Sequence, residues 1–350
     1  MDKKRIIAVA PELREYLNHY GRYVKLPVHY EDLTRFTAGT DLLDQDGNDT
    51  LWQTVYFNEA EREELYMGLR KIYALLHMDG NYSALPHLEV DRIDYCLFGN
   101  TRPFRVRIIN QLNDNYDHFY VKQMDASRIY GLELEELLSP NSLMYLIDGK
   151  TLIEEHIAGL PGDDFFKHNL DVGPLNQIRI AKEFIKFNER CFVRLLGDMR
   201  AYNYIVDVTP DIEGNQYRLR AIDFDQQSYE GRKNFYLPQY FKNNNPIIFL
   251  GMKLLRPATV KQYQLEERSM IAARIKANTE RIRRLLDVMV DDHISKPEFI
   301  IQLAKELGQH HASDRFEGLD TMGKVLRVHL QLLLEKEFTQ STGFLAKGMG

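Results

Sequence analysis

The chain has 350 residues, long enough for two domains, and 44% of them are hydrophobic and 27% charged, as in folded globular proteins rather than disordered ones. The formal net charge of -6 gives no overall attraction to nucleic acid or to an anionic membrane, so neither partner is expected. Two cysteines form no disulfide framework, and no apolar run approaches the roughly 20 residues of a membrane span, so we expect a cytoplasmic protein.

Residues 1–89 have a mixed pattern and are predicted to form an N-terminal extension. Its clearest element is a helix at 58–79 with apolar residues at helical spacing. Asn58 and Glu61 have the spacing of a capping box at the start of this helix. Before it, residues 23–30 are strand-like, and residues 41–50 are acidic and turn-rich without the ligand spacing of an EF-hand.

From residue 90 the apolar pattern changes to a period of two, which is typical of β-strands. A helix is predicted at 126–138, where Pro140 follows its end. The predicted strands lie at 93–97, 104–109, 119–122, 143–147 and 151–157. Residues 90–158 therefore have the predicted order β-β-β-α-β-β.

The second half of the chain is predicted to be mostly helical. Residues 159–245 begin with a linker-like segment, followed by a long helix at 175–195 and a hairpin with strands at 204–206 and 217–222. Residues 246–338 form a helical region, and residues 339–350 are expected to be a flexible tail. The helices predicted in this region lie at 261–291, 296–307 and 320–337.

The loop after the long helix and the hairpin that follows carry candidate groups for phosphoryl transfer. Asp198 and Asn203 are five residues apart, and Asp223 follows the hairpin, whose turn lies midway between Asn203 and Asp223. We expect this hairpin to return Asp223 to a position beside Asn203. Phosphoryl transfer needs a carboxylate near the attacking hydroxyl and Mg²⁺, which carboxylate and amide oxygens bind. This part of the sequence supplies both kinds of group.

These residues resemble a known family. Gly197-Asp198 and Asn203 match the pattern H-G-D-x-x-x-x-N, and Asp223-Phe224 matches the start of D-F-G, with Asp225 in the place of the glycine. The chain thereby resembles the protein-kinase-like superfamily over residues 90–245, closest to its atypical and small-molecule branches such as the aminoglycoside and choline kinases. The resemblance implies an α+β, bilobal protein-kinase-like fold with an N-terminal extension and a C-terminal helical region. Residues 90–158 would be its N-lobe, and residues 159–245 would be the core of its C-lobe, with the catalytic loop. It also implies ATP and Mg²⁺ as cofactors.

The resemblance gives each residue of the loop and hairpin a role. Asp198 would be the catalytic base, and Arg200, two residues later, would steady the γ-phosphate. Asn203 and Asp223 would bind Mg²⁺. Leu196 stands where the family pattern has a histidine, and no A-P-E sequence follows Asp225, so the resemblance to ordinary protein kinases is weaker.

The nucleotide-binding residues implied by the resemblance lie in residues 90–158. Lys122 of the third strand would contact the α- and β-phosphates. Its ion-pair partner would be one of three glutamates on the next helix, of which Glu133 fits a short helix best; the others are Glu135 and Glu136. The remaining candidates are Gly99, which would let backbone amides approach a phosphate, and a hinge from Glu155 to Ile157, which would bind adenine through backbone groups.

Three functions remain open. The first is an ATP-dependent phosphotransferase acting on a hydroxyl of a small molecule or a protein. The second is a pseudokinase that binds nucleotide or a partner as a scaffold, and the third is an AMP transferase, which the release of pyrophosphate would distinguish. His293, His310, His311 and His329 have no spacing typical of a zinc site, and we expect them to be solvated. The basic residues of 261–291 are expected to form a solvated helix face, or alternatively a surface for a substrate or an anionic partner.

Overall fold

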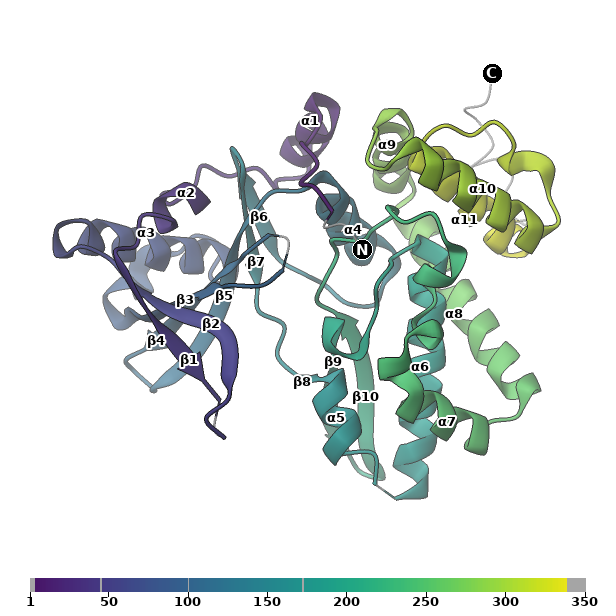
Figure 1. Ribbon diagram of the computed structural model, residues 1–350, viewed down its shortest axis with the longest axis horizontal. Coiled ribbons are helices and arrows are strands. Elements are labelled where there is room, and N and C mark those ends of the chain that lie inside the picture. The colour runs from purple at the N-terminus through teal and green to yellow at the C-terminus, as the bar shows by residue number, and fades with distance from the viewer. Residues whose placement is uncertain (1–3, 45, 100, 172, 339–350) are drawn as a thin grey trace. The chain divides into compact units, whose positions relative to one another are not determined.

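The computed structural model shows an α+β protein with an antiparallel sheet and many helices, which is the predicted class and is consistent with a bilobal kinase-like fold (Figure 1). The structure describes residues 4–44, 46–99, 101–171 and 173–338. The predicted tail at 339–350 lies outside these residues. The chain divides into two compact units: unit 1 is Met1–Asp125 with Leu143–His156, and unit 2 is Ala126–Ser142 with Ile157–Gly350.

Unit 1 is built on an antiparallel sheet, and its β3–β7 confirm the strands predicted between residues 93 and 157. Alternate residues of β4 (Phe104, Val106 and Ile108) are fully buried, as expected for a strand with one face on the core. In order across the sheet, the strands are β1 (Ala38–Leu43), β2 (Asp49–Tyr56), β3 (Leu88–Cys96), β4 (Phe104–Asn110), β5 (Asn115–Gln123), β7 (Thr151–Glu155) and β6 (Tyr145–Asp148).

The helix predicted at 58–79 is present as α3 (Glu59–His77), and its buried residues Leu69 and Ile72 belong to the same core as β3 and β4. The prediction of a capping box was wrong, because Asn58 occupies the N-cap position but its side chain makes no hydrogen bond to the helix. Unit 1 also contains α1 (Pro11–His19) and the short α2 (Tyr30–Leu33).

One prediction for the N-terminal extension was wrong, and two strands there were missed. Residues 23–30 form no strand; a single bridge joins Tyr23 to Ile147, and the chain then turns into α2. The acidic segment is indeed a turn, in which Asp44 Oδ1 accepts hydrogen bonds from the backbone N–H groups of Asp46 (2.9 Å) and Asn48 (2.8 Å). The flanking strands β1 and β2 were missed because β1 is mostly exposed and shows no apolar alternation.

Unit 2 is organised around α6 (Pro174–Arg194), whose residues Ile180, Phe184 and Phe187 are buried. This helix packs against α7, α8 and β10. The hairpin predicted at 204–222 is confirmed as β9 and β10. The other elements of unit 2 are α4 (Ala126–Leu138), β8 (Leu160–Pro161), α5 (Gly162–His168), β9 (Tyr204–Asp211), β10 (Gly214–Ala221), α7 (Asn245–Leu254), α8 (Pro257–Ala277), α9 (Thr279–Asp291), α10 (Pro297–His311) and α11 (Met322–Phe338).

The single helix predicted at 261–291 is two helices, α8 and α9, which are separated at Asn278. Asn278 Nδ2 donates to Arg274 O (3.2 Å), and Thr279 Oγ1 donates to Lys276 O (2.8 Å). Polar side chains of this kind compete with the helical backbone for its hydrogen-bonding groups, which favours a break. Apolar periodicity alone could not reveal this interruption.

The helix α4 belongs to unit 2 and is almost wholly buried there. Glu133 is fully buried and accepts two hydrogen bonds from Arg281 Nη2 of α9, at 3.0 and 2.8 Å. Glu135 forms a buried ion pair with Arg194 of α6. Arg281 therefore belongs to an internal ion pair, which corrects the expectation that the basic residues of this region are solvated.

The helices and the division into units bear on two further predictions. Among the described residues, no helix is both long enough and apolar enough to cross a membrane. The residues predicted as a kinase-like N-lobe, 90–158, are shared between unit 1 and unit 2. The functional boundaries at 89–90, 158–159 and 245–246 stay predictions.

Candidate active site

The loop that carries Asp198 follows directly on α6. Leu195 ends the helix with a left-handed backbone (φ 54°), and Asp198 is itself left-handed (φ 59°). For a residue with a Cβ this conformation costs about 1–2 kcal/mol, and it persists where the surroundings fix the chain. Here Asp198 N–H donates to Phe235 O (3.2 Å), and a Cβ at Gly197 would lie only 2.6 Å from the Phe235 ring. The loop is therefore tightly fixed and requires glycine at 197.

Asn203 closes the loop back onto Asp198. Its side-chain Nδ2 donates to the backbone carbonyl of Asp198 (2.7 Å), and its backbone N–H donates to Arg200 O (2.8 Å). A carbonyl oxygen only accepts hydrogen bonds, so this contact fixes the orientation of the amide. The nitrogen of the Asn203 amide therefore faces Asp198 O, and Oδ1 is the atom that a metal ion would contact.

The hairpin returns the chain to this loop as predicted. Ala221 of β10 pairs with Tyr204 of β9, and the next residue, Ile222, donates its N–H to Asn203 O (3.0 Å). Asp223 therefore follows immediately on a residue that is hydrogen-bonded to Asn203. The structure brings Asp198, Asn203 and Asp223 together within unit 2.

Asp198 is half-buried and lies beside Arg200. Burial raises the pKa of the Asp198 carboxyl above its usual value, while the positive charge of Arg200 opposes this rise. Arg200 Nε donates to Asp198 Oδ1 (2.8 Å), and its Nη1 donates to the Tyr202 hydroxyl (3.2 Å). A carboxylate with a raised pKa accepts a proton more readily, which suits a general base. Arg200 is thus placed to orient Asp198, and its predicted role toward the γ-phosphate stays a prediction.

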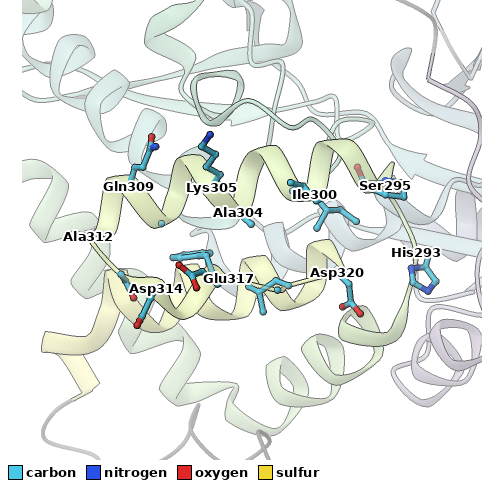
Figure 2. A pocket seen from close by; sticks show the side chains of 17 residues that line it. His293, Ser295, Ile300, Ala304, Lys305, Gln309, Ala312, Asp314, Glu317 and Asp320 are labelled. Atoms are coloured by element: carbon cyan, nitrogen blue, oxygen red, sulfur yellow. The ribbon is translucent and has the colours of Figure 1, made fainter.

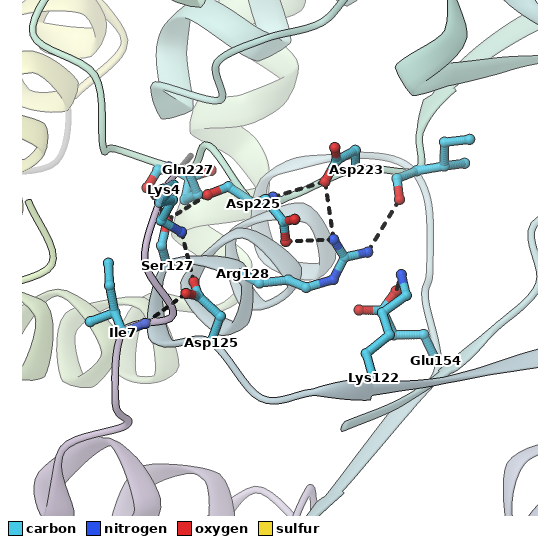
Figure 3. A network of polar contacts seen from close by, with 11 residues as sticks. Lys4, Ile7, Lys122, Asp125, Ser127, Arg128, Glu154, Asp223, Asp225 and Gln227 are labelled. Atoms are coloured by element: carbon cyan, nitrogen blue, oxygen red, sulfur yellow. Dashed lines mark hydrogen bonds and ion pairs between the residues drawn. The ribbon is translucent and has the colours of Figure 1, made fainter. Parts of the chain in front are cut away.

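Arg128, near the start of α4, was not predicted as a site residue. Figure 3 shows its guanidinium between two carboxylates: Nη1 lies 3.0 Å from Asp223 Oδ1 and 2.8 Å from Asp225 Oδ1. Only 3% of the Arg128 side chain is exposed. Nothing in the local sequence marks this residue, because its partners lie almost 100 positions away along the chain.

The donor atoms fit Mg²⁺, which is bound through one or two carboxylates together with phosphate and water oxygens. Asn203 Oδ1 and the Asp223 carboxylate are oxygens of this kind, and 36% of the Asp223 side chain is exposed. Arg128 already places a positive charge at the same carboxylate. Within the described ranges, no group of three or more His, Cys, Asp or Glu residues is arranged to hold a metal ion.

In unit 1, Lys122 of β5 forms a buried ion pair with Glu154 of β7, with Nζ 2.6 Å from Oε2. The two residues are diagonal neighbours across the strands, within reach of long side chains, since Lys122 pairs with Leu152 in the sheet. Sequence reasoning missed Glu154, which is one of two adjacent glutamates at the end of β7, because the pairing of β5 with β7 was not known from the sequence. Lys122 and Glu133 belong to different units, and their predicted ion pair stays a prediction.

The other nucleotide-binding candidates lie between β3 and β4 and at or just after the end of β7. Gly99, between β3 and β4, has a left-handed backbone (φ 84°), and the space where a Cβ would lie is open. Glu155 ends β7, and its carboxylate Oε1 accepts from Met144 N–H (2.9 Å). Ile157 is buried and follows in unit 2. Phosphate binding at Gly99 and adenine binding at Glu155 and Ile157 stay predictions.

A separate pocket lies along α10 in unit 2 (Figure 2). Its volume is about 1370 Å³, and its lining mixes basic and acidic side chains such as Lys305, Asp314 and Glu317 with apolar ones such as Ile300. None of the predicted site residues lines it.

The histidines of the C-terminal helices are not all solvated, contrary to expectation. His329 is fully buried; its Nε2 contacts Phe192 O (3.0 Å), and its Nδ1 contacts His311 Nε2 (2.9 Å). Since a carbonyl oxygen only accepts, His329 carries its proton on Nε2, and His311 donates to Nδ1. Two histidines joined in this way form part of the core rather than a zinc site.

Comparisons with known proteins give little further information. No protein-family model matches the chain, and no curated protein matches it by sequence. Among solved structures, the chain is similar to an ethanolamine kinase from Plasmodium vivax, at 12% sequence identity and a TM-score of 0.30. The similarity covers 80% of this chain and 92% of that one. At this TM-score, the similarity carries no assignment of family, substrate or activity.

Proposed function

We propose that the chain is a cytoplasmic ATP-dependent phosphotransferase that moves the γ-phosphoryl group of ATP to a hydroxyl of a small molecule or a protein. One observation carries the proposal. Asn203 Nδ2 donates a hydrogen bond to the Asp198 carbonyl (2.7 Å). Asn203 O accepts one from the N–H of Ile222, the residue before Asp223 (3.0 Å). Asn203 thereby links the backbone of the base candidate Asp198 to the segment that carries Asp223.

Each of these residues has a distinct part in the proposed reaction. Asp198 accepts the proton of the attacking hydroxyl, and its raised pKa favours this step. Arg200 holds the Asp198 carboxylate in place through its 2.8 Å hydrogen bond. Mg²⁺, when bound, neutralises the charge of the phosphates, and Asn203 Oδ1 and the Asp223 carboxylate would hold it. Lys122, Gly99 and the Glu155–Ile157 backbone would bind the nucleotide.

A scaffold that binds nucleotide without transferring phosphate is the second candidate. The pairing of Asp198 with Arg200 and of Asp223 with Arg128 favours it, because each acidic group already has a cationic partner. An AMP transferase is chemically related and differs in its product. The acceptor remains open in all three cases.

Calorimetry of ATP binding with and without Mg²⁺ tests the proposal, using the wild type and Asp223→Asn, with the products identified afterwards. We expect Mg²⁺-dependent binding in the wild type, loss of that dependence in Asp223→Asn, and ADP as the product. Pyrophosphate would assign AMP transfer, and binding without turnover against a range of hydroxyl acceptors would assign the scaffold. Absence of any nucleotide binding by the wild type would refute all three functions.

A further inference from the structure

The two acidic residues on either side of Phe224 both contact the guanidinium of Arg128. The Nη1 atom of Arg128 lies 3.0 Å from Asp223 Oδ1 and 2.8 Å from Asp225 Oδ1, and Nη2 donates to Ile222 O (3.3 Å). The backbone N–H of Asp225 also donates to Asp223 Oδ1 (3.0 Å). Residues 222–225 therefore accept hydrogen bonds from both Nη atoms of Arg128, on α4, and from the N–H of Asp225 (Figure 3).

Arg128 is held firmly in this position. The neighbouring Ser127 Oγ donates to Gln227 O (2.7 Å), which joins the start of α4 to the acidic segment. At Gly131 the helix approaches so closely that a Cβ would lie 2.9 Å from Phe224 Cβ. A guanidinium stays protonated in proteins, so Arg128 is a permanent positive charge. The carboxylates of Asp223 and Asp225 thus have a built-in counter-ion.

We infer that Arg128 is a positioning residue that occupies part of the cation site of Asp223 and Asp225, and that it weakens the binding of divalent ions there. The inference rests on the proposed function in taking Asp223 as a metal ligand. With Arg128 present, the three side chains have a combined charge of -1 instead of -2, and a divalent ion at Asp223 is repelled by the guanidinium. Charges a few ångströms apart near a protein surface interact by several times the thermal energy, so removal of Arg128 should tighten divalent-ion binding at least about tenfold.

The same contacts predict a second property. Without Arg128, the two carboxylates lose the guanidinium that contacts both of them in a partly buried site, and the folded state becomes less stable. A divalent ion should then restore the lost stability by taking the place of the guanidinium. Arg128→Gln should therefore depend on a divalent ion for its stability, whereas the wild type should not.

The test uses the full chain without nucleotide, so that its outcome is separate from that of the proposed function. Mn²⁺ binding is titrated by electron paramagnetic resonance, and thermal unfolding is followed in chelator and in Mg²⁺. We expect Arg128→Gln to bind Mn²⁺ at least about tenfold more tightly than the wild type and to gain thermal stability from Mg²⁺. The double variant Arg128→Gln/Asp223→Asn should lose both effects.

Arg281→Gln is the matched control, since it removes another arginine whose partner is a buried carboxylate on α4. It should lose stability without gaining affinity for Mn²⁺ or rescue by Mg²⁺. If Arg128→Gln does not fold in chelator, its refolding yield with and without Mn²⁺ replaces the affinity measurement.

The possible results separate clearly. A folded Arg128→Gln with unchanged or weaker Mn²⁺ binding overturns the inference, as does a misfolded one that Mn²⁺ never rescues. Tighter Mn²⁺ binding in Arg128→Gln, combined with a wild type that binds no nucleotide, would support the inference and refute the proposed function. Mg²⁺-dependent ATP binding by the wild type, without tighter Mn²⁺ binding in Arg128→Gln, would support the proposed function and refute the inference.

Discussion

Replacement of Arg281 by glutamine tests how firmly α4 is anchored in unit 2. Glu133 is fully buried, and both of its carboxylate oxygens accept from Arg281 Nη2, at 3.0 and 2.8 Å. Arg281→Gln removes the cation that contacts both oxygens of this buried carboxylate. Loss of one partner of a buried ion pair costs about 3–5 kcal/mol. The Arg281 side chain is 21% exposed, so some water reaches the pair, and we expect about 3 kcal/mol, at the lower end of that range.

The measurement is urea denaturation followed by circular dichroism, together with the melting temperature. For a folding unit of this size, about 3 kcal/mol corresponds to a fall of about 6–12 °C in the melting temperature. Arg283→Gln is the control, because Arg283 lies on the same helix but pairs with the exposed Glu280, and its loss should cost less than about 1 kcal/mol. The double variant Glu133→Leu/Arg281→Leu should recover most of the loss. A cost below about 1 kcal/mol for Arg281→Gln would show that the reasoning about this pair is wrong.

Three further predictions concern the remaining polar groups. Lys122→Met should lower the free energy of unfolding by about 3 kcal/mol because Glu154 stays buried, while Lys122→Met/Glu154→Leu should recover stability in urea titrations without recovering nucleotide affinity in calorimetry. Asn203→Leu removes the hydrogen bond to Asp198 O and a metal-binding oxygen; phosphoryl transfer should fall by at least about a hundredfold in an ADP-release assay, and an unchanged rate would remove Asn203 from the site. Burial lowers the pKa of His311 to about 4 and that of His329 well below its ordinary value, so the unfolded chain takes up protons before the folded one does. Stability should therefore be lost as the pH falls from the ordinary histidine range near 6.5 toward 4, and His329→Gln should lose part of this dependence in denaturation curves measured across that range.

The sequence predicted elements whose patterns are local and repetitive. Strands β3–β7 alternate clearly, and α3 and α6 have continuous apolar faces, so each was found within a few residues of its observed ends. The hairpin from β9 to β10 was found because its turn residues lie midway between Asn203 and Asp223. In these cases the information that determines the element lies within the element itself.

What the sequence missed depends on tertiary contacts. β1 is mostly exposed, and Val55 is the one fully buried residue of β2, so no apolar alternation revealed these strands. Arg128 and Arg281 are ordinary charged helix residues in the sequence, and their importance arises from partners at Asp223 and Glu133, far away along the chain. Pairings of this kind are created by the fold, and no local pattern encodes them.

The division of unit 1 into two chain segments has a consequence for synthesis on the ribosome. The chain leaves unit 1 at Asp125, forms α4, and returns at Leu143 to add β6 and β7. Because β7 pairs with β5, the hydrogen-bonding edge of β5 stays open while α4 is being made. Until β7 has emerged and paired, the edge of β5 is open to pairing with other chains and to aggregation. Timely translation of this short stretch therefore protects the sheet before any ligand is present.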